Sequence, residues 1–269
     1  MPVATIAVLM TCHNRRECTV RCLHSLKRQS IDQGLRLFLT DDGSTDGTRD
    51  AVLDLWPEAV VLNGDGNLYW NQGMRKAWQA AAESDPDYFW LVNDDTIMEA
   101  FALEQLLSMI PSPEARLIAV GAVIDPTSGR QVYGGWRKRG RQKILAQGRV
   151  EDCDAMNANC ALVPRAVFRE MGMFHSAYTH AMGDFDYGME ARRRGIRVIQ
   201  MARPVAFCLG NSDKGTWRDR SLGLKERFRR IISPKGLPPR EWLVYTWRNE
   251  GWFWPLRFLS PYIRILLGG

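Results

Sequence analysis

The segment LFLTDDGSTDGT, residues 37–48, is the part of the sequence that decides the fold. An apolar run, Leu35–Thr40, is followed there by Asp, Gly, Ser and Thr residues, which favour a turn and the start of a helix. Asp46 is placed to cap a helix that runs to Leu55. Short apolar runs recur along the first 125 residues, with helix-like segments between them, at Val3–Met10, Ala59–Leu62, Tyr88–Asn93 and Leu117–Ile124. This alternation predicts an α/β fold, with a mostly parallel central sheet and helices on both of its faces.

The second half of the chain has a looser pattern. The segment Asp125–Val150 is rich in Gly and Arg and shows no clear period, so we predict a functional or mobile loop there. A strand at Met156–Val163 and a helix from Asp184 to Arg194 follow. The other expected elements are a helix from Pro164 to Met171, strands at Ile196–Met201 and Val205–Leu209, and a basic amphipathic helix around Leu224–Ile232.

Length and composition exclude several protein classes. Of the 269 residues, 45% are hydrophobic and 25% charged, which is ordinary for a globular protein and excludes disordered, collagen-like and coiled-coil chains. The six Cys include no CxxC pair, which argues against a disulfide framework or a zinc knuckle and favours reduced thiols in the cytoplasm. No apolar run reaches about 18 residues, and no basic region precedes the apolar start. We therefore expect neither a membrane-spanning helix nor a signal peptide.

The net charge of +6 is unevenly distributed. Residues 214–269, which we call the C-terminal arm, contain 12 Lys and Arg against 4 Asp and Glu, whereas residues 1–213 contain 24 against 26. Five of the ten Trp also lie in the arm. We therefore predict an acidic or neutral body, 1–213, and a helical, basic arm, 214–269. No RNA- or DNA-binding motif accompanies the basic charge, so a nucleic-acid partner is not expected.

Carboxylates are concentrated where two of the predicted strands end. Asp41 and Asp42 follow one strand, and Asp94 and Asp95 follow another. Either pair alone could be a solvated turn, but the carboxyl ends of parallel strands meet at one edge of a sheet, where ligands bind. Adjacent carboxylates repel each other unless a cation or hydrogen-bond donors compensate, and oxygen ligands suit Mg²⁺ or Mn²⁺. The sequence has no glycine-rich phosphate loop, so we expect a metal ion to neutralise the diphosphate of any bound nucleotide.

Five segments, taken in order over roughly residues 5–210, resemble the family 2 inverting glycosyltransferases of the GT-A fold. LFLTDDGSTDGT is the most specific and is similar to the family's signature after its second strand. VLMTCHNR resembles the first strand with its nucleotide-contacting turn, and FWLVNDDTIM lies where the family has its DxD-like motif. NGDGNLYWNQGMRKAW resembles the loop and helix that close over the nucleotide, and HAMGDFDYGMEARRRG resembles the later acidic motif. The resemblance implies that a sugar moves, with inversion, from a nucleotide-sugar donor to a saccharide or lipid-linked saccharide acceptor in cell-surface polysaccharide biosynthesis.

The resemblance also implies roles for residues of the first half of the chain. It divides the body into a nucleotide-binding half, 1–125, and an acceptor half, 126–213. Asn67 and Arg75 are weaker nucleotide-binding candidates, and Arg75 could equally be a solvated helix residue. The resemblance places Thr11 and Asn14 at the nucleotide's base and ribose, together with either Asp41 or Asp42, the other of which holds the loop. It places Asp94 at the ribose or behind the metal, and Asp95 on Mn²⁺ or Mg²⁺.

Asp184 aligns with the family's catalytic base, and Gly183 replaces the usual Glu before it. Direct displacement needs one base, which takes the proton of the acceptor hydroxyl. Asp186 is the alternative base or a residue that positions the helix, and Asp184 could instead only cap that helix. Many relatives also carry a late His that completes the metal site, whereas this chain has Cys208 in that stretch. The metal site is therefore expected to be incomplete or differently built.

Acceptor recognition is expected in the second half of the chain. Trp70, Trp136 and Tyr178 could stack on sugar rings or pack in the core, and the basic segment Trp136–Arg149 could reach a diphosphate or be solvated. In the arm, basic charge beside the apolar residues from Trp252 to Leu267 favours contact with the cytoplasmic surface of a membrane, although packing on the body or a second subunit is the alternative. Two other functions stay open: a sugar-nucleotidyltransferase, which would need glycines after the first strand, and a non-catalytic saccharide-binding protein on the same fold.

Overall fold

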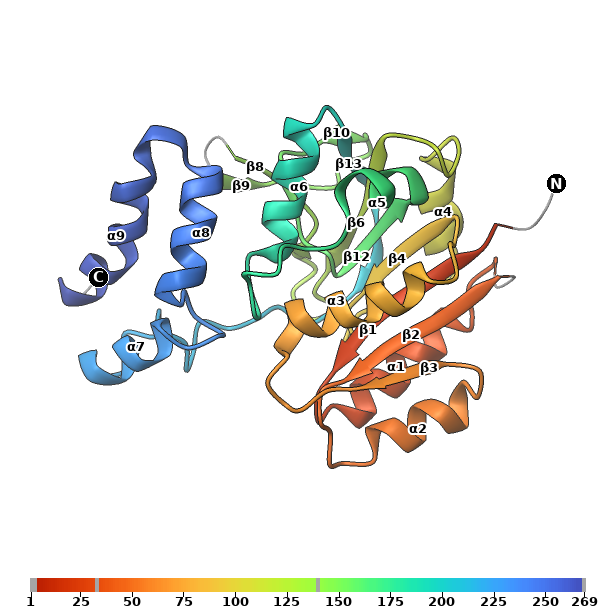
Figure 1. The fold of residues 1–269 in the computed structure, drawn as a ribbon, viewed down its shortest axis with the longest axis horizontal. Helices are drawn as coiled ribbons and strands as arrows, with labels where there is room; N and C mark the ends of the chain where they lie inside the picture. Colours follow the sequence, from red (N-terminus) through yellow and green to blue (C-terminus); the bar gives the residue numbers. More distant parts are fainter. Residues whose placement is uncertain (1–3, 32–33, 139–140, 268–269) are drawn as a thin grey trace.

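The computed structural model describes residues 4–31, 34–138 and 141–267. Across its central sheet the strands follow in the order β10 (Glu151–Asp152), β13 (Arg197–Phe207), β6 (Leu117–Ile124), β12 (Cys160–Pro164), β4 (Tyr88–Val92), β1 (Ile6–Cys12), β2 (Leu35–Asp41) and β3 (Val60–Asn63) (Figure 1). The strands from β4 to β3 are parallel, as are β6 and β13, whereas β12 runs antiparallel between β4 and β6. The predicted α/β architecture is confirmed.

Helices cover both faces of this sheet. On one face lie α1 (Arg16–Leu26), α2 (Thr48–Leu55) and α4 (Ala102–Ser108), and on the other lie α3 (Tyr69–Ala82), α5 (Arg165–Met171) and α6 (Gly183–Arg193). Successive side chains of β1 alternate between the two cores: Val8 and Met10 pack in the first, and Ala7 and Leu9 in the second. Every residue of β1 is buried, which is why the strand has a continuous apolar sequence.

The strands β1, β2 and β4 bring their carboxyl ends to one edge of the sheet. Cys12 at the end of β1 is paired with Asp41 at the end of β2, and Asn93, Asp94 and Asp95 follow the end of the neighbouring β4. The edge predicted from the sequence is therefore present, and the motifs that end these strands lie along it.

Two longer elements, a helix and a strand, differ from the sequence prediction in their bounds or continuity. The sequence pattern predicts a helix at Met74–Glu83, whereas α3 begins at Tyr69. It begins earlier because the Asp42 carboxylate accepts hydrogen bonds from the Leu68 and Tyr69 backbone N–H groups. One strand, β13, replaces the two short strands expected between Ile196 and Leu209, and it keeps pairing with β6 across irregular register between Gln200 and Ala206.

The segment Asp125–Val150, predicted as a loop, contains short strands. They are β7 (Gln131–Tyr133), β8 (Gly135–Arg137) and β9 (Gln142–Lys143), and β8 also pairs with β11 (Ala155–Met156). The sequence pattern also predicts a helix from about Met98 to Met109, whereas the structure has the short strand β5 (Ile97–Met98) followed by α4. Strands of two or three residues are too short to show a period in a sequence.

The described residues of the arm, 214–267, form the helices α7 (Leu224–Ile231), α8 (Pro239–Asn249) and α9 (Trp254–Leu266), with a 3₁₀ turn at Gly251–Phe253. Figure 1 shows them grouped at one end of the molecule, with α8 between α9 and α6 and with α7 below. A third apolar cluster joins arm and body, in which Trp242 and Tyr245 of α8 lie with Tyr178, Met182 and Met189. Among the described residues, no helix has the length and apolar character that crossing a membrane requires.

Candidate active site

A cavity of about 410 Å³ lies at the carboxyl edge of the sheet. The turns after β1, β2 and β4, the start of α3, the segment before α6, and the turn after α7 all contribute to its wall. Its lining residues are Thr11, Cys12, His13, Arg15, Asp42, Gly66, Tyr69, Trp70, Asp94, His180, Ser233, Pro234 and Lys235. Of the residues predicted to bind the nucleotide, the structure thus brings Thr11, Asp42 and Asp94 together around one space of ligand size.

The two carboxylates of the DDGS turn have different surroundings. Asp42, which is 3% exposed, accepts backbone hydrogen bonds from Gly66 (2.9 Å), Leu68 (3.3 Å) and Tyr69 (2.8 Å). It therefore holds the loop before α3 and also lines the cavity. Asp41, also buried, accepts a hydrogen bond from the Ser44 backbone N–H at 2.9 Å and shapes the turn.

Thr11 and Asn14 hold the end of β1 against its neighbours. The Thr11 hydroxyl donates to the Thr40 carbonyl at 3.2 Å, and a Cβ atom at Gly73 would collide with that hydroxyl. Only glycine therefore allows α3 to approach β1 so closely at this point. Asn14 accepts a hydrogen bond from the Thr45 backbone N–H at 2.8 Å and so links the turns after β1 and β2.

Arg15 bridges the two carboxylates that follow β4. Its guanidinium donates to Asp94 at 3.1 Å and to Asp95 at 2.8 Å. Asp94 is 5% exposed, and burial raises the pKa of its carboxyl to about 7 in spite of the adjacent Arg15 charge. Cys208 donates its thiol hydrogen to the other Asp95 oxygen at 3.4 Å, so it lies beside the carboxylate proposed to bind the metal.

The surroundings of Asp94 and Asp95 fit a metal ion that takes most of its ligands from elsewhere. One Asp94 oxygen is buried and has no hydrogen-bond partner among the described residues. Within the same part of the chain, no group of three or more His, Cys, Asp or Glu is arranged to hold a metal. Mg²⁺ is commonly held by one or two carboxylates together with substrate phosphates and water. These residues therefore fit a cation that depends on the donor's phosphates for coordination.

Asp184 lies in the first turn of α6 and is not among the residues that line this cavity, although His180, four residues before it, is. Its two oxygens accept backbone hydrogen bonds from Phe185 at 2.9 Å and Ala158 at 3.2 Å. Burial raises the pKa of the carboxyl to about 6, although those N–H groups favour the charged form. Gly183 before it approaches Asn71 of α3 so closely that any Cβ would collide with the Asn71 side chain. Here the chain has no room for the Glu that relatives carry at this position.

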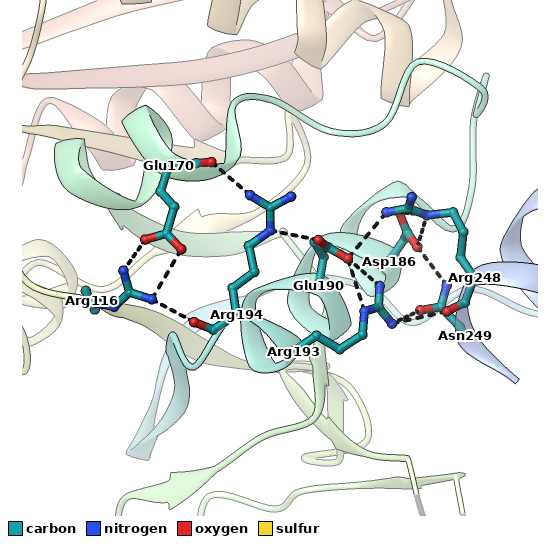
Figure 2. A network of polar contacts seen from close by, with 8 residues as sticks. All are labelled: Arg116, Glu170, Asp186, Glu190, Arg193, Arg194, Arg248 and Asn249. Atoms are coloured by element: carbon teal, nitrogen blue, oxygen red, sulfur yellow. Dashed lines mark hydrogen bonds and ion pairs between the residues drawn. The ribbon is translucent and has the colours of Figure 1, made fainter. Parts of the chain in front are cut away.

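Asp186 belongs to a network of ion pairs that holds the arm to the body (Figure 2). Only 2% exposed, it accepts hydrogen bonds from Arg248 at 3.0 Å and from the Asn249 amide at 2.7 Å, both at the end of α8. Arg193 of α6 joins the same group by donating to the Asn249 side chain at 2.8 Å. The network continues through Glu190 and Arg194 to Glu170 and Arg116 on the body. Both Asp186 oxygens thus have partners from the arm.

The remaining predicted residues are dispersed. Asn67 is exposed on the loop before α3, and Arg75 donates from α3 to the Phe174 carbonyl, so neither is among the cavity's lining residues. Trp70 does line the cavity and donates its indole N–H to Asn93 at 2.8 Å. Tyr178 is fully buried against Tyr245, which leaves no ring face for a sugar and removes it from the acceptor candidates. Trp136 lines a second cavity, on the arm side of α6.

Sequence reasoning missed several residues of the cavity. Arg15 lay within the quoted motif VLMTCHNR, and its side chain reaches the acidic turn after β4 across 79 positions. His180 also lines the wall, and burial together with the Lys235 charge lowers its pKa to about 4, so the ring is neutral. Ser233, Pro234 and Lys235 come from the turn after α7, and no local pattern in the arm indicated that they reach this cavity.

A protein-family model described as "Glycosyl transferase family 2" matches residues 7–172, which is more than half of the chain. The chain belongs to glycosyltransferase family 2. Its α/β architecture is accordingly the GT-A fold that the five motifs predicted. The match contains Thr11, Asp42 and Asp94 but ends before Asp184, so the role of Asp184 in this glycosyltransferase stays a prediction.

Two relatives of this glycosyltransferase come from Mycobacterium tuberculosis, strains CDC 1551 / Oshkosh and ATCC 25618 / H37Rv. Each is 25% identical over 220 residues, which cover 71% of this chain and 71% of the relative. Each bears the name N-acetylglucosaminyl-diphospho-decaprenol L-rhamnosyltransferase. Similarity at this level supports the family and leaves the sugar of this enzyme open.

Proposed function

We propose that this glycosyltransferase moves a hexosyl or deoxyhexosyl group from a nucleotide-diphosphate sugar to a lipid-linked saccharide, with inversion, in cell-surface polysaccharide biosynthesis. The observation that carries the proposal is the arrangement of Asp42, Asp94 and Arg15 around one cavity, whose wall includes His180, four residues before Asp184. The relatives named for rhamnosyl transfer onto N-acetylglucosaminyl-diphospho-decaprenol support a lipid-linked acceptor and a sugar of this type.

In the proposed reaction Asp184 is the base. It takes the proton of the acceptor hydroxyl while that oxygen bonds to the anomeric carbon and the bond from this carbon to the diphosphate oxygen breaks. Attack from the face opposite the leaving diphosphate inverts the configuration. A base works best when its pKa lies just below the working pH, and burial has raised that of Asp184 to about 6.

Three groups are proposed to compensate the negative charge of the donor's diphosphate. Arg15 and Lys235 line it with positive charge, and the Asp94–Asp95 turn would hold Mn²⁺ or Mg²⁺. When bound, such an ion supplies Lewis-acid stabilisation of the departing diphosphate. Thr11, Asp42 and the ring of Tyr69 would orient the nucleobase and the ribose of the donor.

The experiment that tests this proposal is acceptor-dependent release of nucleoside diphosphate from a panel of nucleotide sugars. The acceptor is an N-acetylglucosaminyl-diphospho-prenol. We expect Asp184→Asn to lower kcat by about 1,000-fold with donor affinity unchanged, because general-base catalysis contributes roughly 10²–10⁴-fold. Asp54→Asn, which changes an exposed carboxylate on α2, is the matched control and should retain full activity. Saccharide binding without turnover of any donor would favour the non-catalytic alternative.

We also propose that the arm contacts a membrane surface. Apolar side chains on its outer face are strongly exposed, with Trp252 at 97%, Leu267 at 81% and Phe253 at 69%. The arm as a whole is basic, with 12 Lys and Arg against 4 Asp and Glu. Amphipathic helices of this composition lie in the headgroup region, and each basic residue near an anionic surface contributes about 1 kcal/mol. A lipid-linked acceptor would be met at that surface.

A further inference from the structure

A second cavity, of about 440 Å³, lies between the arm and the body, and we call it the arm groove. The body contributes Trp136 of β8 and Phe185 of α6, and the arm contributes Trp242 and Tyr245 of α8 with Arg264 of α9. The two α8 rings stack at 5.4 Å between centroids, so they form a flat apolar wall. Its volume is in the range of roughly 300–1,000 Å³ that is typical of ligand sites.

The arm groove begins beside the proposed base. Trp136 donates its indole N–H to Asn157 at 2.8 Å, and the Asn157 side chain in turn hydrogen-bonds to Asp184. His180 lines the cavity at the sheet edge, which is the proposed donor site and which we call the donor cavity, whereas Met182 and Phe185 line the arm groove. The segment 180–185 therefore separates the two cavities, and Asp184 belongs to this segment.

The charge of the arm groove suits an anion. Six cationic side chains line it, and Glu250 is the one carboxylate among its described lining residues. Glu250 is shared between Arg141, at 2.7 Å, and Arg257, at 3.7 Å. Two carboxylates outside the lining pair with further cations, Glu151 with Arg137 and Asp213 with Arg218. Six cations against these three carboxylates leave a net positive charge. Arginine binds diphosphate oxygens through paired N–H groups. The six cationic residues are Arg137, Lys138, Arg141, Arg218, Arg257 and Arg264.

At its outer side the arm groove meets apolar surface. Lys138, Arg141 and Arg257 also line a wider hollow of about 1170 Å³, whose wall includes the exposed Phe253 and Leu256. On α9, the helix that carries Arg257 and Arg264, the side chains of Leu259 and Ile263 are 47% and 46% exposed. A ligand held at the arginines could therefore continue along apolar side chains away from the base.

We propose that the arm groove binds the acceptor as a prenyl-diphosphate-linked saccharide. The diphosphate pairs with the arginines, the saccharide points past Trp136 toward Asp184, and the prenyl chain follows the exposed apolar face of α9. This inference rests on the proposed function, because it assigns the acceptor's place relative to Asp184. Most of the residues that line the arm groove, from Ala181 onward, lie beyond the family match, which ends at residue 172, and none of them lines the cavity at the sheet edge.

The test measures binding without turnover, by calorimetry with farnesyl diphosphate, farnesol and inorganic pyrophosphate as probes. We expect farnesyl diphosphate to bind more tightly than the other two, because farnesol lacks the diphosphate and pyrophosphate lacks the prenyl chain. Arg218→Ala combined with Arg264→Ala should lower the affinity for farnesyl diphosphate at least tenfold and leave the affinity for nucleoside diphosphates unchanged. Both residues lie at the surface of the groove, so the fold should tolerate the change, which a melting curve checks. Arg240→Ala, which removes an exposed arginine outside the groove, should have no effect.

Three results would overturn the proposal: no farnesyl diphosphate binding to the unaltered protein, equal binding by the double variant and Arg240→Ala, or competition between farnesyl diphosphate and nucleoside diphosphates for one site. Failure of the proposed function has a different signature. In that case no nucleotide sugar is turned over, while the binding of farnesyl diphosphate still depends on Arg218 and Arg264.

Discussion

At the scale of single residues, Asp184 and Asp186 are two positions apart on α6 and have opposite surroundings. Asp184 accepts hydrogen bonds from two backbone N–H groups and from the neutral Asn157 side chain, whereas the Arg248 guanidinium binds both oxygens of Asp186 and Asn249 binds one of them. The structure therefore favours Asp184 as the base and Asp186 as a residue that positions the helix.

Substitutions at these two positions should separate the roles. Arg248→Ala should lower the free energy of unfolding by about 3 kcal/mol, because it leaves the Asp186 charge buried without its cation. Asp186→Asn should keep kcat within about tenfold, in contrast to Asp184→Asn. Denaturant unfolding and steady-state rates provide the two readouts. A loss of kcat in Asp186→Asn as large as in Asp184→Asn, with stability unchanged, would identify Asp186 as the base instead.

The pH dependence should report Asp184. With its pKa near 6, kcat should rise about tenfold per pH unit below 6 and level off above pH 7. The stability of the fold changes with pH in the opposite direction to kcat. Because the folded pKa lies above the ordinary 3.8, the wild type loses stability relative to Asp184→Asn as pH rises from about 3.8 to 6. Melting curves of both proteins between pH 4 and 8 measure this difference, and a difference that does not change with pH would contradict the assignment.

The sequence showed which residues to consider at this scale but not their division of labour. Asp41 and Asp42 could not be distinguished by their position after β2, and only the backbone of the loop before α3 shows that Asp42 holds it. Cys208 could be placed in the late stretch where relatives have His, while its 3.4 Å contact with Asp95 depends on the pairing of β13 with β5 and β6.

At the scale of elements, the junction of α3 with α6 depends on Gly183. A Cβ at this position would collide with the Asn71 side chain, whose amide group donates to the Tyr178 carbonyl at 2.7 Å. Gly183→Ala should therefore destabilise the protein by about 1–3 kcal/mol. Asn71→Ala in the same chain should restore part of that loss, and a double-mutant cycle of unfolding free energies measures the coupling. Strict additivity of the two changes would contradict this account of the junction.

Long, continuous elements were predictable and short or interrupted ones were not. Leu117–Ile124 was predicted with the bounds that β6 has, because every position of a buried parallel strand is apolar. The start of α3 was missed by five residues, since a carboxylate from another strand caps it. The β8–β9 pairing was missed because its few residues alternate too briefly to show a period.

At the scale of the whole molecule, the arm is joined to the body by buried contacts and presents apolar side chains outward. Its place could not be predicted, because Asp186 and Arg248 are 62 positions apart and neither carries a local signal of the other. Its basic, aromatic character was apparent in the sequence, and the exposed Trp252 and Phe253 agree with that prediction without testing membrane contact.

Membrane contact is testable with vesicles. The protein should co-sediment with vesicles that contain anionic lipid, and less so at high salt, because screening weakens the attraction of the basic residues. Trp252→Ser with Phe253→Ser should reduce the bound fraction several-fold, since both rings would enter the headgroup region. Phe101→Ser, at an exposed aromatic residue of the body, is the control. Absence of binding at low salt would contradict the proposal.

The most direct test of the central claim, that the cavity at the sheet edge binds a nucleotide-sugar donor, is thermal unfolding with a panel of nucleoside diphosphates and nucleotide sugars, with and without Mn²⁺. A ligand at 100 times its Kd adds about 2.7 kcal/mol, which should raise Tm by several degrees. We predict such a shift for one nucleotide series, larger with Mn²⁺, with the Mn²⁺ increment lost in Asp95→Asn and the shift itself reduced in Lys235→Ala. The absence of a shift with any of these ligands, or a shift of the same size in both variants, would contradict the account.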